Sequence, residues 1–156
     1  MVSTHHEPSA NHQILCVEGD YSICGGFENA YLSWDGGGVD IGDHYGHPTS
    51  AIMDAAQGWC VTAGEGLEIC FFEHGLPGPD KPIEDYPFRT QVLWRHGNPP
   101  PDGQMCWFVE KLWFAESEAG ADGRPVRVLL QVLVEPGTAR AGLYEVDIVS
   151  LAWRRI

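Results

Sequence analysis

The first 80 residues contain no lysine and no arginine, although they contain twelve Asp and Glu residues. Residues 81–156 hold all nine basic side chains, together with ten acidic ones. Nucleic acids and anionic membranes are bound through a basic face, so this charge distribution argues against both as partners. The net charge of −13 either favours a cationic partner or serves solubility alone.

Long apolar runs are also absent, because no segment approaches the roughly 20 apolar residues that a membrane-spanning helix needs. The N-terminus is polar and lacks the cationic start and apolar stretch of a secretory signal. We therefore expect a cytoplasmic protein, with residues 1–12 as a flexible tail and residues 13–156 as a single β-rich domain. Lysine is scarce beside arginine while Ala and Gly are frequent, which suits a bacterial genome rich in G and C.

No Cys-x-x-Cys pair occurs among the five cysteines, and an odd number cannot all form disulfides with one another. The cysteines are Cys16, Cys24, Cys60, Cys70 and Cys106. Each lies in or beside an apolar segment, so we expect reduced thiols that pack as small hydrophobic side chains. Cys60, Cys70 and Cys106 are expected to be largely buried. A redox or catalytic thiol is the alternative, and Cys24 beside Gly25 and Gly26 is its best candidate.

Recognisable catalytic motifs are missing as well. There is no G-x-S-x-G nucleophile elbow, and Gly64-Glu65-Gly66 lacks the third glycine and the helix of a dinucleotide site. The carboxylates of Glu65, Glu68 and Glu73 are suited to acid–base chemistry, but any acidic β protein offers such pairs. We therefore expect a non-enzymatic protein without a cofactor.

Strand patterns are what the chain does contain. Strands are expected within residues 13–17, 21–34, 59–63, 67–72, 91–95, 105–114, 126–135 and 143–153. The last three segments predict a three-stranded antiparallel meander, since apolar residues alternate through 126–135. Residues 51–57 follow a capping sequence and precede Gly58, which favours one short helix. The expected fold is mainly β, an antiparallel two-layer sandwich or partly open barrel of about seven to ten strands with at most two short helices.

One local phrase resembles the hairpin of β-propeller blades. It runs as Gly58-Trp-Cys-Val-Thr-Ala-Gly-Glu-Gly66 and continues into Leu67-Glu-Ile-Cys70. A blade hairpin likewise places a turn glycine before Trp-x-Val-Thr-x-Gly. The resemblance covers residues 58–70 and implies a hairpin there.

The segment Asp40-Ile-Gly-Asp43-His44-Tyr-Gly-His47 holds the best group of candidate metal ligands. Two imidazoles and two carboxylates are ligands that bind Zn²⁺ or another divalent ion. The glycines indicate a loop, however, and no helix aligns the two histidines. We expect polar loop residues and no metal. The alternative is a small β-barrel or cupin-like metal-dependent enzyme, or a small-ligand-binding module, that uses these four side chains.

Aromatic residues close to turns in the acidic half are typical of a protein-binding surface, because interfaces combine aromatic anchors with a charged rim. Stacking of these rings on a sugar is the alternative. The candidate partner-binding residues are Trp34, Asp35, Asp40, Asp43, Tyr45 and Glu65. In its whole-chain character this small, acidic, Trp-rich β protein resembles the bacterial immunity proteins that neutralise toxins delivered between cells. That resemblance implies a cognate protein toxin, of cationic charge, as the partner. An anionic face speeds the encounter with such a toxin.

Overall fold

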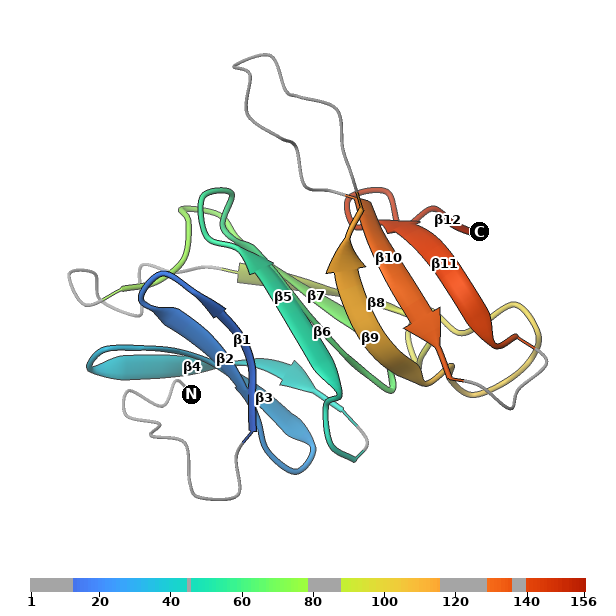
Figure 1. Cartoon of the computed structure of the whole chain (residues 1–156), viewed down its shortest axis with the longest axis horizontal. Coiled ribbons are helices and arrows are strands. Elements are labelled where there is room, and N and C mark those ends of the chain that lie inside the picture. The colour runs from blue at the N-terminus through green and yellow to red at the C-terminus, as the bar shows by residue number, and fades with distance from the viewer. Residues whose placement is uncertain (1–12, 45, 79–87, 116–128, 136–139) are drawn as a thin grey trace, which may run out of the picture.

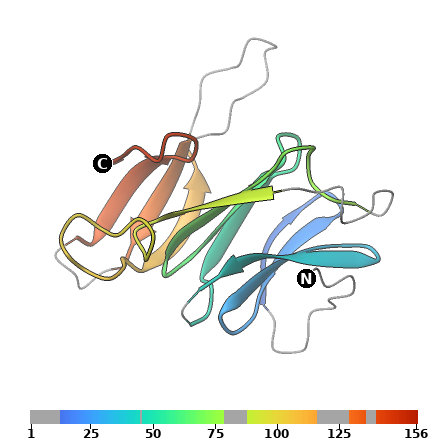
Figure 2. The same cartoon turned by 180° about the vertical axis from the view of Figure 1, so that it is seen from behind.

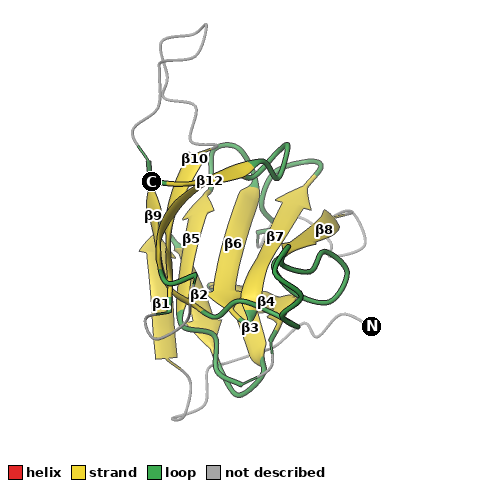
Figure 3. Ribbon diagram, turned by 90° about the vertical axis from the view of Figure 1, so that its right-hand side faces the viewer, coloured by secondary structure: helices red, strands yellow, loops and turns green. Residues whose placement is uncertain are grey.

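A computed structural model describes residues 13–44, 46–78, 88–115, 129–135 and 140–156. Within these ranges the chain forms twelve β-strands and no helix (Figure 3). The expected tail, residues 1–12, lies outside the described residues, as does Tyr45. None of the described segments is a helix of the length and apolar character that crossing a membrane requires.

The strands form three sheets of four, each an antiparallel meander in which consecutive strands pair. The first sheet consists of β1 (Gln13–Glu18), β2 (Tyr21–Gly25), β3 (Asn29–Trp34) and β4 (Gly37–Asp43). The second consists of β5 (Ser50–Asp54), β6 (Trp59–Gly64), β7 (Gly66–Phe72) and β8 (Phe88–Leu93). The third consists of β9 (Val109–Phe114), β10 (Leu129–Val134), β11 (Gly142–Asp147) and β12 (Trp153–Arg155).

The second sheet lies between the other two (Figure 1). β5 lies beside both β1 and β9, so the first strands of the three sheets are neighbours. Viewed from behind, the chain leaves β8 and crosses from the second sheet to the third (Figure 2). Two hydrogen bonds join the sheets where β5 meets β9: the Thr49 hydroxyl donates to the Val109 carbonyl at 2.6 Å, and the Leu112 N–H donates to Ser50 Oγ at 3.2 Å.

The first and third sheets cover the two faces of the second sheet, so its central strands carry apolar side chains on both faces. All six residues of β6 are buried. Trp59, Val61 and Ala63 belong to the core between the second and third sheets, and Cys60 belongs to the core between the first and second. A strand between two packed layers loses the alternation of polar and apolar residues, and this explains why residues 59–63 are apolar apart from Thr62, whose hydroxyl bonds to His44.

Several sequence-based predictions are confirmed. The fold is mainly antiparallel β, and the strands of the last third pair in sequential order. Leu130, Val132 and Val134 all point into the core, as the alternation in that segment predicts. The hairpin expected at residues 59–72 is formed by β6 and β7, which pair from Trp59 with Phe71 to Gly64 with Gly66.

Three expectations differ from the structure. The expected helix at residues 51–57 was wrong, because residues 50–54 form β5 and pair with β6. Ala51 and Met53 point into the core between the first and second sheets, which we call the first core. The burial gained there outweighs the helix propensity of the segment. The twelve strands exceed the seven to ten expected, and they form three sheets where a two-layer sandwich or a partly open barrel was predicted.

Four aromatic side chains form the centre of the core between the second and third sheets, which we call the second core. Trp94, Trp107, Tyr144 and Trp153 are in mutual contact, with ring centroids 5.1–5.7 Å apart. Trp94 and Trp107 are buried in this cluster, and Trp153 packs against it from β12. Trp113 is half-buried on the other side of the third sheet, with the Lys111 ammonium 5.3 Å from its ring centre.

All five cysteines are free thiols. Cys60 and Cys70 are buried, as expected. Cys106 is only partly buried, contrary to expectation, because it lies in the loop before β9 and not in a strand of the core.

Candidate functional site

A β-bulge in β4 decides where its two aspartates point. Asp40 pairs with Tyr31 and Asp43 pairs with Asn29, and the register shifts by one residue between these two pairs. Cross-strand partners share a face of the sheet, and Tyr31 and Asn29 are two residues apart on β3. The carboxylates of Asp40 and Asp43 therefore lie on the same face. Three residues apart on a regular strand, they would point to opposite faces.

These aspartates line a groove of about 300 Å³ at the free edge of β4, where the first sheet meets the second. Glu68 of β7 and the β8 residues Phe88 and Thr90 contribute to the same groove. The Asp43 N–H donates to Glu68 Oε2 at 2.9 Å, so the edge of β4 is tied to the second sheet at this point. Three carboxylates from two sheets thus lie along one groove, which we call the acidic groove.

Arg95 neutralises one of these three carboxylates. Its Nη1 is 3.2 Å from Glu68 Oε2 and also donates to the Asp43 carbonyl. Burial raises the pKa of the Glu68 carboxyl, while the Asp43 N–H and Arg95 act in the opposite direction. Arg95 bonds to the backbone carbonyl of Asp43, and Asp40 and Asp43 are both exposed at the groove.

Three ion pairs engage arginines of the second half of the chain. Arg140 pairs with Asp102 at 3.6 Å, and Arg154 pairs with Glu145 at 3.2 Å. Both pairs join residues of the second half to one another. The Arg95–Glu68 ion pair crosses between the halves. With twelve acidic residues and no basic one, the first half keeps an excess of negative charge.

Trp34 and Asp35 lie at the other end of β4 from Asp43. Trp34 pairs with Gly37 at the turn, and six residues along a strand span about 20 Å. The Trp34 indole lies over Gly37 and packs against the first core, while Asp35 is exposed. The structure thus places these two residues in a separate patch at the tip of the β3–β4 hairpin.

Glu65 borders a different hollow. It is half-buried, forms an isolated bridge with Phe108, and lines a hollow of about 570 Å³ with Gln104, Met105 and Cys106. Met105 is 89% exposed there, so this hollow has an apolar rim. Of the six predicted partner-binding residues, the structure brings Asp40 and Asp43 together, and Tyr45 falls outside the described residues.

His44 lies behind the acidic groove and is 3% exposed. Its Nε2 is 2.7 Å from Thr62 Oγ1 of β6. Burial, assisted by the positive charge of Arg95, lowers the pKa of His44 to about 4, so the ring is neutral at pH 7. The sequence offers no signal for this burial, which depends on β4 packing its last residues against β6.

His47 points elsewhere. It is exposed, and its ring packs edge-on against Phe27, with centroids 5.4 Å apart. The four candidate ligands Asp40, Asp43, His44 and His47 are therefore divided between an exposed groove, a buried contact and a separate loop. Across the described residues, no group of three or more His, Cys, Asp or Glu side chains is arranged to hold a metal ion.

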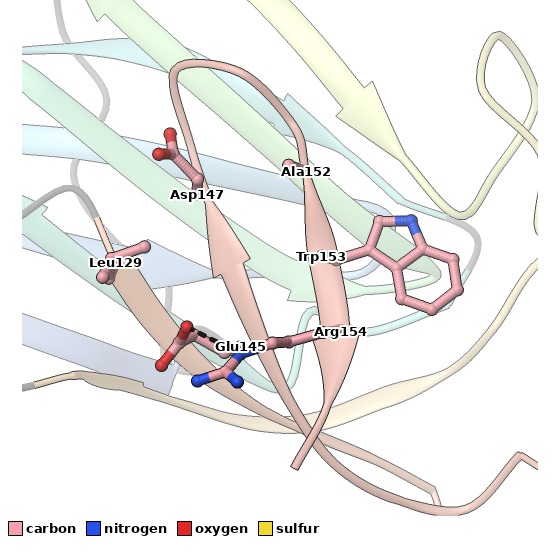
Figure 4. A pocket seen from close by; sticks show the side chains of 6 residues that line it. All are labelled: Leu129, Glu145, Asp147, Ala152, Trp153 and Arg154. Atoms are coloured by element: carbon pink, nitrogen blue, oxygen red, sulfur yellow. Dashed lines mark hydrogen bonds and ion pairs between the residues drawn. The ribbon is translucent and has the colours of Figure 1, made fainter.

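A third hollow, of about 270 Å³, lies on the last three strands (Figure 4). Its polar groups already have partners within the third sheet. Arg154 Nε donates to Glu145 Oε1, and Asp147 Oδ1 accepts from the N–H groups of Val149 and Ser150. The Trp153 ring points away from this ion pair and into the aromatic cluster (Figure 4). These contacts stabilise the sheet, so we assign the hollow no binding role.

Comparison with known proteins gives no independent indication of function, because no family model, no curated protein and no solved structure matches this chain. The acidic groove is accordingly the candidate site on its geometry and charge alone. Sequence reasoning missed Glu68 as a member of it. Its alternation with Leu67 and Ile69 marks Glu68 as a strand residue, but its proximity to Asp43 depends on how two separate sheets pack.

Proposed function

We propose that this chain is a non-enzymatic binding protein, an immunity protein that neutralises a cationic bacterial toxin by masking it. The observation that carries the proposal is the acidic groove, in which the bulge of β4 turns Asp40 and Asp43 to one face beside Glu68. A groove with this excess of carboxylate is suited to a lysine or arginine side chain of the partner.

The distribution of charge supports the same partner chemistry. The first half of the chain has twelve carboxylates and no basic residue, and Arg140 and Arg154 pair with carboxylates of the second half. Electrostatic attraction between an anionic face and a basic protein raises the association rate by about 10- to 1,000-fold. Fast capture is what an inhibitor of a toxic protein requires.

The test is the binding kinetics of the purified chain with the product of the neighbouring gene, measured at several salt concentrations. Replacing Asp40 and Asp43 by Lys is expected to slow association by about tenfold or more at low salt and to flatten its salt dependence. Both side chains are exposed, so the fold is expected to tolerate the change. Dissociation is expected to change less, because rim charges act mainly on the encounter.

A matched control reverses two acidic residues at the third sheet, Glu110 in β9 and Glu135 directly after β10. Both are exposed, and their replacement by Lys changes the net charge by the same amount. If the charge acts at the acidic groove, the control variant associates nearly as fast as the wild type. Equal slowing of the two variants would show that only net charge matters, and unchanged association of the Asp40 and Asp43 variant would refute the docking site.

The alternative of a metal-dependent enzyme has no supporting observation in the described residues, because its four candidate ligands point in different directions. Metal analysis of the mildly purified chain separates the two functions. Stoichiometric metal, together with turnover of a small substrate, would contradict the proposal.

A further inference from the structure

Two buried thiols lie opposite each other on neighbouring strands of the second sheet. Cys60 of β6 and Cys70 of β7 are direct cross-strand partners, and they are 0% and 1% exposed. Both belong to the core between the first and second sheets, so their side chains lie on the same face of the hairpin. The proposed binding function makes no use of either thiol.

The register indicates how close the two residues are. The Phe72 N–H donates to the Gly58 carbonyl at 2.8 Å, which makes Gly58 and Phe72 a hydrogen-bonded pair of the antiparallel ladder. Pairs of this kind recur every two residues, so Cys60 and Cys70 form the next one. The Cα atoms of such a pair are about 5.5 Å apart, and disulfides join Cα atoms about 4.4–6.8 Å apart.

The thiols themselves interact. A hydrogen bond to Cys70, together with burial, raises the pKa of the Cys60 thiol well above its usual range. The sulfur atoms are thus already adjacent, while the thiolate that reacts with oxidants is scarce at neutral pH. A reaction at this pair is therefore slow and depends on brief opening of the surrounding strands.

We propose that Cys60 and Cys70 are a redox-sensitive pair, which a small peroxide converts into a reversible cross-strand disulfide. In the first step one thiolate attacks a peroxide oxygen, the O–O bond breaks, and a sulfenic acid and hydroxide form. In the second step the other thiolate attacks the sulfenic sulfur, the S–S bond forms, and the S–O bond breaks with loss of hydroxide. The two protons that the thiols released convert the two hydroxides into water. Overall, two thiols lose two electrons, and hydrogen peroxide is reduced to two molecules of water.

The same register predicts that the disulfide is easily reduced. The Cβ atoms of directly opposite residues are about 4.5–5.5 Å apart and lie at the wider end in hydrogen-bonded pairs, whereas a relaxed disulfide needs about 3.5–4.5 Å. The bond must therefore draw β6 and β7 together, and strained disulfides are the labile ones. The disulfide closes the short loop between residues 60 and 70, in the one sheet that both cores share.

The test exposes the reduced full-length chain to excess hydrogen peroxide, removes the peroxide, and alkylates the remaining thiols after denaturation. Peptide mapping without reduction is expected to find Cys60 joined to Cys70. Glutathione, added before alkylation, is expected to restore five free thiols. We expect the oxidised protein to melt a few degrees higher, below the shift of about 5–10 °C that loop closure alone predicts.

A matched pair of variants assigns this shift to the proposed bond. Cys60→Ala and Cys24→Ala each remove one buried thiol, but only Cys60→Ala is expected to abolish the rise in melting temperature on oxidation. The mapping of the wild type does not depend on either variant being stable. Two results would overturn the proposal. The first is a disulfide that uses Cys16 in place of Cys70. The second is full alkylation of both Cys60 and Cys70 when the oxidation is carried out in denaturant just below the unfolding midpoint, where the strands open frequently.

Discussion

At the scale of single residues, His44 shows how the fold changes the chemistry of a side chain near the acidic groove. Its ring is enclosed between β4 and β6 and bound to Thr62. Burial lowers the pKa of His44 from 6.5 to about 4, because a charged imidazolium is poorly solvated there. The neutral ring is part of the folded state, so protonation must weaken that state.

The first prediction is a loss of stability in acid that is due to His44. Its folded pKa lies below its unfolded value, so its contribution is complete above about pH 6.5 and is lost as the pH falls toward 4. The shift corresponds to about 3 kcal/mol of unfolding free energy. Urea denaturation of the wild type and His44→Gln at pH 7.5 and 4.5 measures it.

The stability difference between the two proteins is expected to shrink by about 2–3 kcal/mol between these pH values. Other titrating groups, such as Glu68, are present in both proteins and cancel in the difference. Parallel pH curves for the two proteins would show that His44 is not buried in its neutral form.

At the scale of elements, the turn between β6 and β7 requires a glycine. Gly66 has a φ of +64°, and a Cβ atom built there would collide with the carbonyl oxygens of Leu93 and Trp94. Gly36, in the β3–β4 turn, has a similar positive φ of +88°, but nothing lies within 4 Å of its Cβ position. The two glycines separate the cost of the backbone conformation from the cost of the collision.

We predict that Gly36→Ala lowers the unfolding free energy by about 1–2 kcal/mol, the cost of a left-handed conformation for a residue with a side chain. Gly66→Ala has the same unfavourable backbone conformation and also pushes β8 away from β7. We therefore expect its unfolding free energy to fall by about 3 kcal/mol or more. Urea denaturation of both variants checks the order. A Gly66→Ala protein as stable as the Gly36→Ala protein would show that the start of β7 and the end of β8 separate easily.

How far the sequence predicts an element depends on what decides its structure. The alternation around Leu130 predicts β10 well, because one face of that strand is buried and local patterning is enough. The segment around Ala51 has the composition of a short helix, and only its packing against two other sheets makes it a strand. The site was less predictable still, since the shared face of Asp40 and Asp43 results from a single bulge that leaves no mark in the pattern.

At the scale of the whole molecule, the second sheet belongs to both cores. β6 directs Val61 into the core with the third sheet and Cys60 into the core with the first. Neither outer sheet can keep its buried face if the second sheet unfolds, so the two cores are expected to be lost together. The tryptophans make this testable, because Trp59, Trp94 and Trp107 are buried in only one of the two cores.

The last prediction therefore concerns a substitution in the core that lacks these tryptophans. Leu32 of β3 is fully buried between the first and second sheets, and Leu32→Ala is expected to cost about 2–5 kcal/mol. If the cores unfold as one unit, tryptophan fluorescence and far-ultraviolet circular dichroism shift to the same lower urea midpoint, although most of the reporting rings are in the other core. Leu130→Ala, in the core with those rings, is the matched variant. A Leu32→Ala protein whose circular dichroism changes before its fluorescence would show that the first sheet unfolds separately, because the second and third sheets would then hold their shared core without it.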